Sequence, residues 1–384
     1  MWFKSPGTYF GIAYVKSFSD YFLIRYLKVI ILFIYIYILE RDKDMNLEDK
    51  LKLIKRNTFE ILTEDELINI LKTKENPSVY IGTATTGRPH IGYFCWAQKL
   101  ADFSKAGFKI KVLIADIHGA LDNTPWELLD KRYEYYNIVI PAMVESLGGK
   151  IENIKIIKGS SYQLNQNFVM DLYKLSSYVS VRNSTKAASD VVKMGDNPML
   201  SGLLYPLLQA LDEQYLDADI QLGGIDQRKI MVLAREFLPK LGYKPRIEVM
   251  FPLMKALTQD GKMSSSIQNS KIDLLDDLKT IQDKLKSAYC QEGDPENGIM
   301  DFAKIIIMTQ KQDKGEEFII DRPEKWGGPL KFKTIEDLEK AFVSKQLHPM
   351  DLKAGVAIEI DKLLAPIREK MKGKEQLIKE AYPE

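Results

Sequence analysis

Short apolar runs alternate with longer helical patterns between residues 79 and 251, and this alternation constrains the fold most strongly. The apolar runs are 79–82, 109–115, 154–157, 218–222 and 247–251. Runs of this length are typical of strands, and strands separated by helices pair in parallel because each parallel connection needs a crossover. The sequence therefore predicts an α/β domain with a parallel sheet.

A long helical stretch at about 126–205 separates the two halves of this alternation, and we interpret it as a helical insertion in the sheet. After about residue 270 the strand patterns stop. Helices are predicted over 272–290, 295–311, 335–345 and 349–371. We expect an α/β domain over 45–270, followed by an all-helical domain over 271–384.

Residues 1–44 differ in composition from the rest of the chain. The apolar run Val29–Leu39 is 11 residues long, whereas a membrane-spanning helix needs about 20. Charged residues follow at 40–43, where a signal peptide would have a cleavage site with small residues. We expect this extension to be dispensable, or translation to begin at Met45, with a signal anchor as the alternative. No stable association with a membrane is expected.

The balance of charges argues against non-specific binding to nucleic acid. Lys and Arg number 54 against 53 Asp and Glu, for a formal net charge of +1, so any contact with RNA must use local basic patches and shape. The two cysteines, Cys95 and Cys290, lie far apart. They predict neither a disulfide framework nor a metal site, and they fit a reducing compartment.

Two short motifs are suited to binding a nucleoside triphosphate. The first is Pro89-His90-Ile91-Gly92-Tyr93, at a turn between a strand and a helix, and the second is the loop Lys262-Met263-Ser264-Ser265-Ser266. A helix N-terminus after a strand offers free N–H groups to phosphates, and the loop supplies a cation and hydroxyls. Each motif alone is a weak signal, because the first fits many turns and the second fits a solvated loop. Together, in this order and among these elements, they are specific.

The two motifs resemble the HIGH and KMSKS signatures of class I aminoacyl-tRNA synthetases. Over most of 46–370 the chain is similar to the tyrosyl-tRNA synthetases of the archaeal and eukaryotic cytosolic type. The similar blocks are 80–87, 204–212, 223–229, 324–328 and 348–353. The second histidine of HIGH is Tyr93 here, and the fourth position of KMSKS is Ser265. These departures imply that one phosphate contact is made differently.

The resemblance implies a Rossmann-like fold for the α/β domain and, within it, a tyrosine-binding site. Its members would be Tyr80, Tyr205, Gln209, Asp212 and Gln227. The spacings of four and three between Tyr205, Gln209 and Asp212 place those three on one helix face. By resemblance, Tyr80 and Asp212 bind the substrate hydroxyl, and the others face its α-amino group. Without the resemblance, Tyr205 and Gln209 would be read as packed polar residues.

The resemblance also implies an ATP site that includes the two motifs. His90, Gly92, Lys262, Ser264 and Ser265 would act in catalysis. ATP would contact His90, Gly92, Gly224, Asp226, Lys262 and Ser265. Mg²⁺ would bridge the pyrophosphate oxygens, with no dedicated metal site in the protein. From its position alone, Asp226 could instead be a helix N-cap. Asp116 and His118 follow a strand end and are further candidates for lining the pocket.

The remaining expectations concern RNA, assembly and location. By resemblance, domain 271–384 reads the anticodon of tRNA(Tyr), with Trp326 stacking on a base and Asp351 bonding a base edge. A core tryptophan is the alternative for position 326. The insertion at 126–205 would form a homodimer, and the enzyme would be cytoplasmic. The rival functions are a tryptophanyl-tRNA synthetase and a non-catalytic tRNA-binding relative, which would have lost His90, Gly92 or Lys262.

Overall fold

The computed structural model describes residues 45–383, except for 193, 260, 262 and 264–270. The expectations for the extension 1–44 and for Lys262, Ser264 and Ser265 therefore lie outside the described residues. From Glu48 onward the chain forms one compact unit.

A six-stranded sheet lies at the centre of this unit, in the order β1-β6-β5-β2-β3-β4. The strands are β1 Glu60–Leu62, β2 Ser78–Ala84, β3 Lys109–Ala115, β4 Ile154–Lys158, β5 Ile220–Gly224 and β6 Ile247–Phe251. β2 to β6 are parallel, whereas β1 pairs antiparallel with β6 at the edge. The predicted parallel sheet is thus confirmed. β1 was not predicted, because three residues are too few to show a strand pattern.

The strand order reverses next to β2. From β2 the chain adds β3 and then β4 on one side, and it later adds β5 and then β6 on the other. In open α/β sheets such a reversal leaves a crevice at the carboxyl ends of the strands, where ligands bind. The topology therefore places the candidate site at the ends of β2 and β5.

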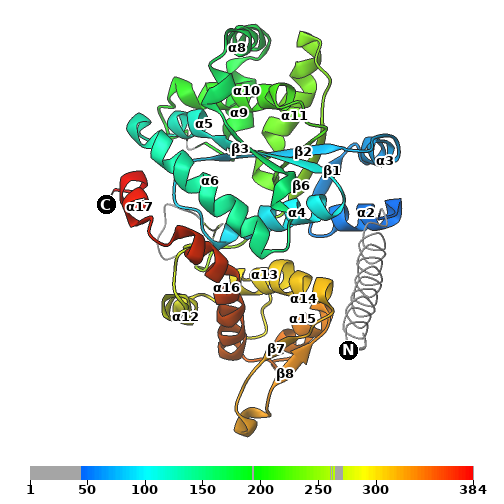
Figure 1. Cartoon of the computed structure of the whole chain (residues 1–384), viewed down its shortest axis with the longest axis vertical. Helices are drawn as coiled ribbons and strands as arrows, with labels where there is room; N and C mark the ends of the chain where they lie inside the picture. The colour runs from blue at the N-terminus through cyan, green and yellow to red at the C-terminus, as the bar shows by residue number, and fades with distance from the viewer. Residues whose placement is uncertain (1–44, 193, 260, 262, 264–270, 384) are drawn as a thin grey trace, which may run out of the picture. The chain divides into compact units, whose positions relative to one another are not determined.

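Helices cover both faces of the sheet (Figure 1). In the region before residue 270 they are α2 Leu47–Lys55, α3 Glu64–Thr73, α4 Phe94–Lys105, α5 Asp116–Leu121, α6 Leu129–Ser146, α7 Ser160–Gln163, α8 Gln166–Tyr178, α9 Val181–Ala188, α10 Leu200–Tyr215 and α11 Arg228–Phe237. The stretch 126–205, expected to be a helical insertion, also contains the sheet strand β4. Short 3₁₀ turns include η1 Ile91–Tyr93 and η4 Ile225–Gln227.

The alternation of side chains along β2 separates a core face from a site face. Val79 and Ile81 pack in the large core with Phe94 of α4 and Tyr136 of α6. Tyr80 points to the opposite face and packs in a small cluster with residues that include Leu216, which directly follows α10. In Figure 1, α8 to α11 lie on one side of the sheet and α4 and α6 on the other.

The region after residue 270 is mainly helical. Its helices are α12 Leu278–Ser287, α13 Gly298–Phe302, the π-helical η7 Ala303–Met308, α14 Thr309–Lys314, α15 Ile335–Val343, α16 Pro349–Met371 and α17 Glu375–Ala381. The expectation of an all-helical region was wrong in one respect, because β7 Phe318–Ile320 and β8 Leu330–Phe332 form an antiparallel pair. Three-residue strands carry too little alternation to be predicted. The chain between them makes the 3₁₀ turn η8 Glu324–Trp326.

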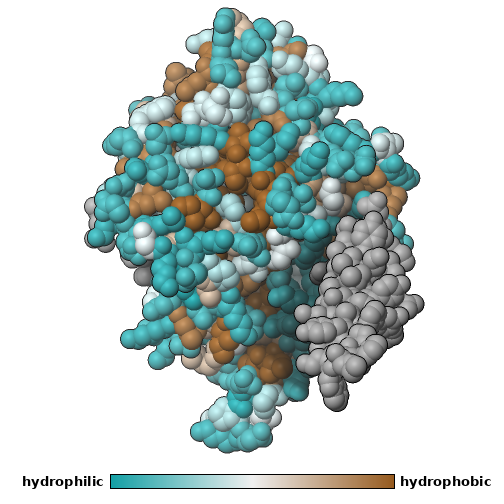
Figure 2. Space-filling view, viewed as in Figure 1, coloured by the Kyte–Doolittle hydropathy of each residue, from teal (hydrophilic) through white to brown (hydrophobic). Residues whose placement is uncertain are grey.

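The face of the described residues shown in Figure 2 is mostly hydrophilic. On the face shown in Figure 2, apolar residues lie in groups interrupted by polar ones. No helix of the described residues has both the length and the apolar character needed to cross a membrane.

Candidate active site

A cavity of about 550 Å³ opens at the reversal of strand order. Ten of the residues proposed above line it: Tyr80, His90, Gly92, His118, Tyr205, Gln209, Asp212, Gly224, Asp226 and Gln227. Asp116 does not, and that expectation was wrong. Its carboxylate accepts a hydrogen bond from the Ser160 backbone N–H at 2.8 Å and so stabilises the turn into α7. The structure thus gathers residues from 80 to 227 around one space.

Helix α10 presents Tyr205, Gln209 and Asp212 to the cavity, as their spacing predicted. Gln209 Nε2 donates to Gln227 Oε1 at 3.0 Å, so two amides from different elements form one pair. The Tyr205 ring packs edge-on against His118, with 4.6 Å between the ring centroids. These contacts restrict the side chains before any ligand is present.

The Asp212 carboxylate is buried, and its two oxygens differ in their contacts. Oδ1 accepts hydrogen bonds from Tyr162 Oη at 2.6 Å and Gln163 Nε2 at 2.8 Å. Oδ2 has no hydrogen-bond partner among the described residues and lies 3.7 Å from His118 Nε2. One oxygen is therefore fixed by the protein, and the other is available to a ligand.

Tyr162 and Gln163 were not identified from the sequence. Both lie in α7, shortly after the carboxyl end of β4. Side chains just beyond the ends of parallel strands tend to reach the ligand crevice. That rule is the signal that could have marked them as candidates.

Burial controls the protonation of the groups around Asp212. Burial raises the pKa of Asp212 from 3.8 to about 7, and the hydrogen bonds from Tyr162 and Gln163 oppose this rise. Burial lowers the pKa of His118 to about 3, so its imidazole is neutral at neutral pH. The cavity thus contains a carboxyl group that titrates near neutrality beside a neutral histidine.

Tyr80 faces Asp212 from the sheet. Its hydroxyl is buried without a hydrogen-bond partner among the described residues. Burial, together with the carboxyl groups of Glu213, Asp212 and Glu248, raises the pKa of Tyr80 well above its ordinary value. The side chain is therefore a neutral phenol that can donate or accept one hydrogen bond from a ligand.

The first motif forms a tight turn in which His90 and Gly92 depend on each other. His90 Nδ1 accepts from the Gly92 backbone N–H at 3.2 Å. A Cβ atom at Gly92 would lie 2.8 Å from His90 Cε1, closer than such atoms approach. Burial, followed by the nearby Lys271, lowers the pKa of His90 to about 3. A neutral ring that accepts at Nδ1 carries its proton on Nε2, so Nε2 is the donor.

Helix α6 anchors the chain just before this motif. The Arg132 guanidinium donates to the carbonyls of Thr85 at 2.8 Å and Thr86 at 2.9 Å. The Tyr136 hydroxyl donates to the carbonyl of Gly87 at 2.6 Å. Three consecutive carbonyls are thereby bonded, which places His90 relative to the sheet.

The end of β5 forms the other wall of the cavity. A Cβ at Gly224 would lie 2.6 Å from Asp226 Oδ1 and 2.8 Å from Leu253 Cδ2, so a larger residue would displace the carboxylate. Asp226 lies inside η4, whose N-cap is Gly224. The N-cap alternative for Asp226 was therefore wrong.

One described residue of the second motif reaches the cavity. Met263 is 7% exposed and lines the cavity, and its backbone N–H bonds the carbonyl of Met254 at 3.2 Å. Lys262, Ser264 and Ser265 are not described, so their roles stay predictions. Among the residues described, no three His, Cys, Asp or Glu side chains are grouped to bind a metal ion.

Gln221 is a further lining residue that the sequence did not reveal. It lies on β5 opposite Tyr80 of β2, and it is 3% exposed. Its Oε1 has no hydrogen-bond partner among the described residues. Only the strand register shows that Gln221 points to the same side as Tyr80.

The two residues expected to contact tRNA lie near one arginine. Trp326 is 65% exposed, with Lys325 Nζ 5.5 Å from its ring centroid, which excludes the core-tryptophan alternative. Arg322 Nε donates to the carbonyl of Gly328 at 2.6 Å, and its Nη1 lies 3.8 Å from Asp351 Oδ2. Arg322 thus connects the turn that follows Trp326 to the first turn of α16.

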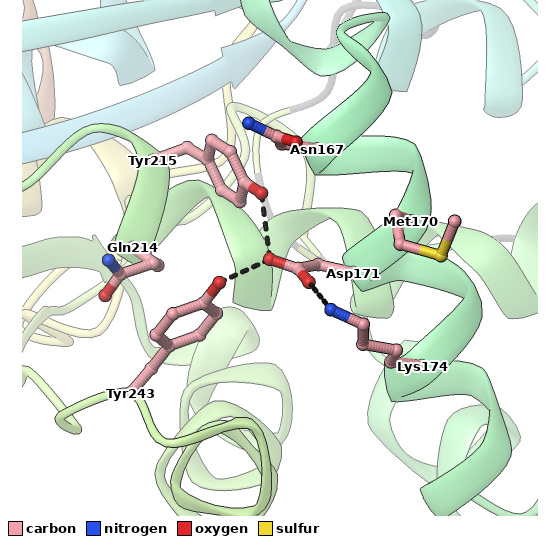
Figure 3. Close-up of a pocket in the computed structure, with 7 residues that line it drawn as sticks. All are labelled: Asn167, Met170, Asp171, Lys174, Gln214, Tyr215 and Tyr243. Atoms are coloured by element: carbon pink, nitrogen blue, oxygen red, sulfur yellow. Dashed lines mark hydrogen bonds and ion pairs between the residues drawn. The ribbon is translucent and has the colours of Figure 1, made fainter.

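A second cavity, of about 330 Å³, lies between α8, α10 and the loop before β6 (Figure 3). Its central carboxylate, Asp171, accepts from the Tyr215 hydroxyl at 2.8 Å, from the Tyr243 hydroxyl and from Lys174 Nζ at 2.9 Å. In Figure 3 the side chains of Tyr215, Tyr243 and Lys174 point toward this carboxylate. Because its oxygens are engaged within the protein, we interpret the cluster as a structural connection between these elements.

Comparison with known proteins gives a consistent result. The family model described as tRNA synthetases class I (W and Y) matches residues 72–365. The cytoplasmic tyrosine–tRNA ligase of Gallus gallus is 49% identical over 88% of this chain, and the chain spans 64% of that protein. The tyrosine–tRNA ligase of Haloarcula marismortui is 40% identical over 88% of this chain and 99% of its own length. The crystal structure of the Archaeoglobus fulgidus tyrosyl-tRNA synthetase with L-tyrosine superposes with a TM-score of 0.79, at 36% identity, over 85% of this chain and all of that one.

Proposed function

Because the chain belongs to the tyrosyl-tRNA synthetases of class I, we propose that it activates L-tyrosine with ATP and transfers the tyrosyl group to tRNA(Tyr). The observation that carries the proposal is that Asp212 Oδ2 and the Tyr80 hydroxyl lie at one cavity and that neither is hydrogen-bonded to another described residue. Both are buried, both lack a hydrogen-bond partner among the described residues, and both lie at the same cavity.

The phenol of the substrate would satisfy both groups. Its hydroxyl would donate to Asp212 Oδ2 and accept from Tyr80. Phenylalanine would leave both groups buried and unpaired, which is strongly unfavourable. Tyrosyl-tRNA synthetases are themselves the reference case for this effect, with roughly 10⁵-fold discrimination against phenylalanine.

The other end of the amino acid would lie near Tyr205 and the pair of Gln209 and Gln227. An amide oxygen or a phenol oxygen accepts from the substrate ammonium group. The hydrogen bond between the two glutamines fixes the direction of each amide before the substrate binds. Less conformational entropy is then lost on binding.

The reaction needs no protein nucleophile. The tyrosine carboxylate attacks the α-phosphate of ATP, the bond from that phosphate to the β-phosphate breaks, and pyrophosphate leaves. A hydroxyl of the 3′-terminal ribose of tRNA then attacks the adenylate, and AMP leaves. Catalysis rests on positioning and on stabilising charge at phosphate.

Each part of the ATP site has a proposed role. Neutral His90 would donate Nε2–H to a phosphate oxygen, and Asp226 would accept from the ribose hydroxyls. Lys262, Ser264 and Ser265 would contact the triphosphate after the loop closes. Mg²⁺ would enter with ATP as part of the substrate.

The proposal extends to RNA, assembly and location. Region 271–384 would bind the anticodon through Trp326 and Asp351. A homodimer would cover exposed apolar side chains on and near α8 and α10, which include Met170, Tyr173, Val181 and Leu200. A cytoplasmic location is proposed from the names of the relatives.

Pyrophosphate exchange into ATP tests the proposal directly. Exchange with the full chain should depend on tyrosine and should not occur with tryptophan or phenylalanine. Exchange with tryptophan alone would identify a tryptophanyl-tRNA synthetase. Absence of exchange with any amino acid, while tRNA still binds, would identify a non-catalytic relative.

A further inference from the structure

A row of polar side chains runs across the sheet behind the tyrosine pocket. Tyr80 of β2 pairs in register with Gln221 of β5, and Gln221 pairs in register with Glu248 of β6. In parallel strands, paired residues point to the same face and lie about 4.8 Å apart. Tyr80 and Gln221 line the cavity, whereas Glu248 lies one strand further away.

Helix α10 adds a second carboxyl group to this row. Glu213 directly follows the pocket residue Asp212, and both Glu213 and Glu248 are 0% exposed. All four of their carboxyl oxygens lack a hydrogen-bond partner among the described residues, as does Gln221 Oε1. Two carboxyl groups therefore lie buried beside an unsatisfied acceptor.

The charged groups around this pair do not neutralise it. Arg246 bonds the Lys244 carbonyl at 2.7 Å and Gln214 Oε1 at 3.1 Å, and Arg235 bonds the Arg246 carbonyl. Both arginines favour ionisation only from a distance.

The carboxyl groups nearby act in the opposite direction. Asp212 raises the pKa of Glu213, and Glu213, followed by Glu66 of α3, raises that of Glu248. Burial is the largest influence on both and raises the pKa of each well above the ordinary range.

Two ionised carboxylates cannot remain side by side here without hydrogen bonds, because burial of an unpaired charge is strongly unfavourable. Neighbouring carboxyl groups relieve this when the pair retains one proton, so that only one of the two is charged. A protonated carboxyl group is also a donor, which is what Gln221 Oε1 lacks.

We propose that Glu213 and Glu248 share one proton and together position Gln221 and Tyr80 at the base of the tyrosine pocket. One of the two carboxyl groups carries the proton, and its O–H donates to Gln221 Oε1, which holds the amide against the sheet beside Tyr80. The glutamates are positioning residues, since they act through Gln221 and Tyr80. The effect on tyrosine rests on the proposed function, whereas the shared proton does not.

The proposal predicts that tyrosine binding weakens at alkaline pH. When the shared proton is lost to solvent, both carboxylates are charged, the donor to Gln221 disappears, and the pocket base is no longer fixed. The Michaelis constant for tyrosine should rise by about tenfold at alkaline pH, the effect of one lost hydrogen bond. The Michaelis constant for ATP should not change, because His90 and Asp226 lie elsewhere in the cavity.

The test compares the full-length wild type with Glu248→Gln and Glu213→Gln, each of which keeps an amide donor and removes one ionisation. Glu236→Gln, at an exposed position of α11, is the matched control. Tyrosine-dependent pyrophosphate exchange and thermal unfolding are measured from about pH 6 to about pH 9.5, bracketing the raised carboxyl pKa values. Titration of the tyrosine amino group affects all four proteins alike, and titration of Asp212 should change only in Glu213→Gln, which removes the charge that interacts with it.

In the wild type and the control, the Michaelis constant for tyrosine should rise at alkaline pH. In either Gln variant, the same constant should not change over this pH range. The Gln variants should also lose less thermal stability than the wild type as the pH rises. Either variant suffices if the other does not fold. The proposal would be overturned if the Michaelis constant for tyrosine depended on pH in the same way in all four proteins. Loss of tyrosine binding at every pH in a Gln variant would also overturn it.

Failure of the proposed function gives a different pattern. The wild type would then show no tyrosine-dependent exchange at any pH, while unfolding would still report the shared proton. The infrared band of a protonated carboxylic acid, recorded above the pKa of Asp212, should be weaker in Glu248→Gln than in the wild type and provides a reading that does not depend on activity.

Discussion

The hydroxyl of Tyr162 donates a hydrogen bond to Asp212 Oδ1 at 2.6 Å and so joins α7 to α10. Gln163, the next residue, donates to the same oxygen at 2.8 Å. Because both bonds fall on one oxygen, the other is left facing the pocket. The selectivity of the site therefore depends on two residues that need not contact the substrate hydroxyl.

Substitution of Tyr162 by Phe should weaken tyrosine binding. The change removes a hydrogen bond to a group that is partly ionised at neutral pH, which corresponds to about 1.5–3 kcal/mol. The Michaelis constant for tyrosine should rise by at least tenfold, with little change for ATP. Loss of this bond should also move the acidic limb of the pH–rate profile upward, because the bond lowers the pKa of Asp212. An unchanged acidic limb would show that the bond does not act on Asp212.

Substitution of Asp212 by Ala should abolish tyrosine activation. The change removes the acceptor for the substrate hydroxyl and leaves the donors of Tyr162 and Gln163 without a partner. Tyrosine-dependent pyrophosphate exchange measures the outcome, and circular dichroism controls for folding. Exchange at the wild-type rate would refute the pocket as described.

The stability of the protein should depend on the ionisation of Asp212. Folding raises the pKa of this carboxyl from 3.8 to about 7. A raised pKa means that the stabilising contribution is complete below the unfolded value and is lost as the pH rises through the folded value. The loss is on the order of 4 kcal/mol between about pH 4 and pH 7.

Asp212→Asn removes this titration and keeps the shape of the side chain. Its free energy of unfolding, measured by urea denaturation, should rise relative to the wild type across that pH range. A constant difference between the two proteins would contradict the assignment of the titration to Asp212.

Substitution of Gly92 by Ala should impair adenylate formation. The new Cβ would lie 2.8 Å from His90 Cε1 and would displace the ring. Loss of one donor to developing charge lowers the rate by about 10²–10³-fold. His90→Ala is the matched comparison, and single-turnover kinetics measures the chemical step. If Gly92 acts through His90, the double variant should be no worse than His90→Ala, and additive losses would contradict that link.

Substitution of Trp326 by Ala should weaken charging of tRNA and leave adenylate formation intact. Stacking of a base on an aromatic ring contributes about 1–3 kcal/mol, so the Michaelis constant for tRNA should rise about tenfold. Because Trp326 is 65% exposed, the melting temperature should hardly change. Trp126→Ala, equally exposed at 65%, serves as the control. A comparable loss in pyrophosphate exchange would place Trp326 outside RNA recognition.

Features that depend on local pattern could be predicted well. The five parallel strands were found because each is a run of several apolar residues between helical patterns. The shared face of Tyr205, Gln209 and Asp212 followed from helical spacing alone. By contrast, β1, β7 and β8 were missed, since each has three residues and is stabilised by the strand beside it.

The sequence by itself determined the class of fold, the two signature motifs and, through the family resemblance, many of the polar residues that line the cavity, because the spacing of elements and the chemistry of residues are local properties. Only the tertiary structure decided how those residues are supported. Tyr162 meets Asp212 across 50 residues of chain, and Gln221 lies between Tyr80 and Glu248 through the strand register. Packing of helices on the sheet sets such distances, and burial in that packing determines which carboxyl groups are charged.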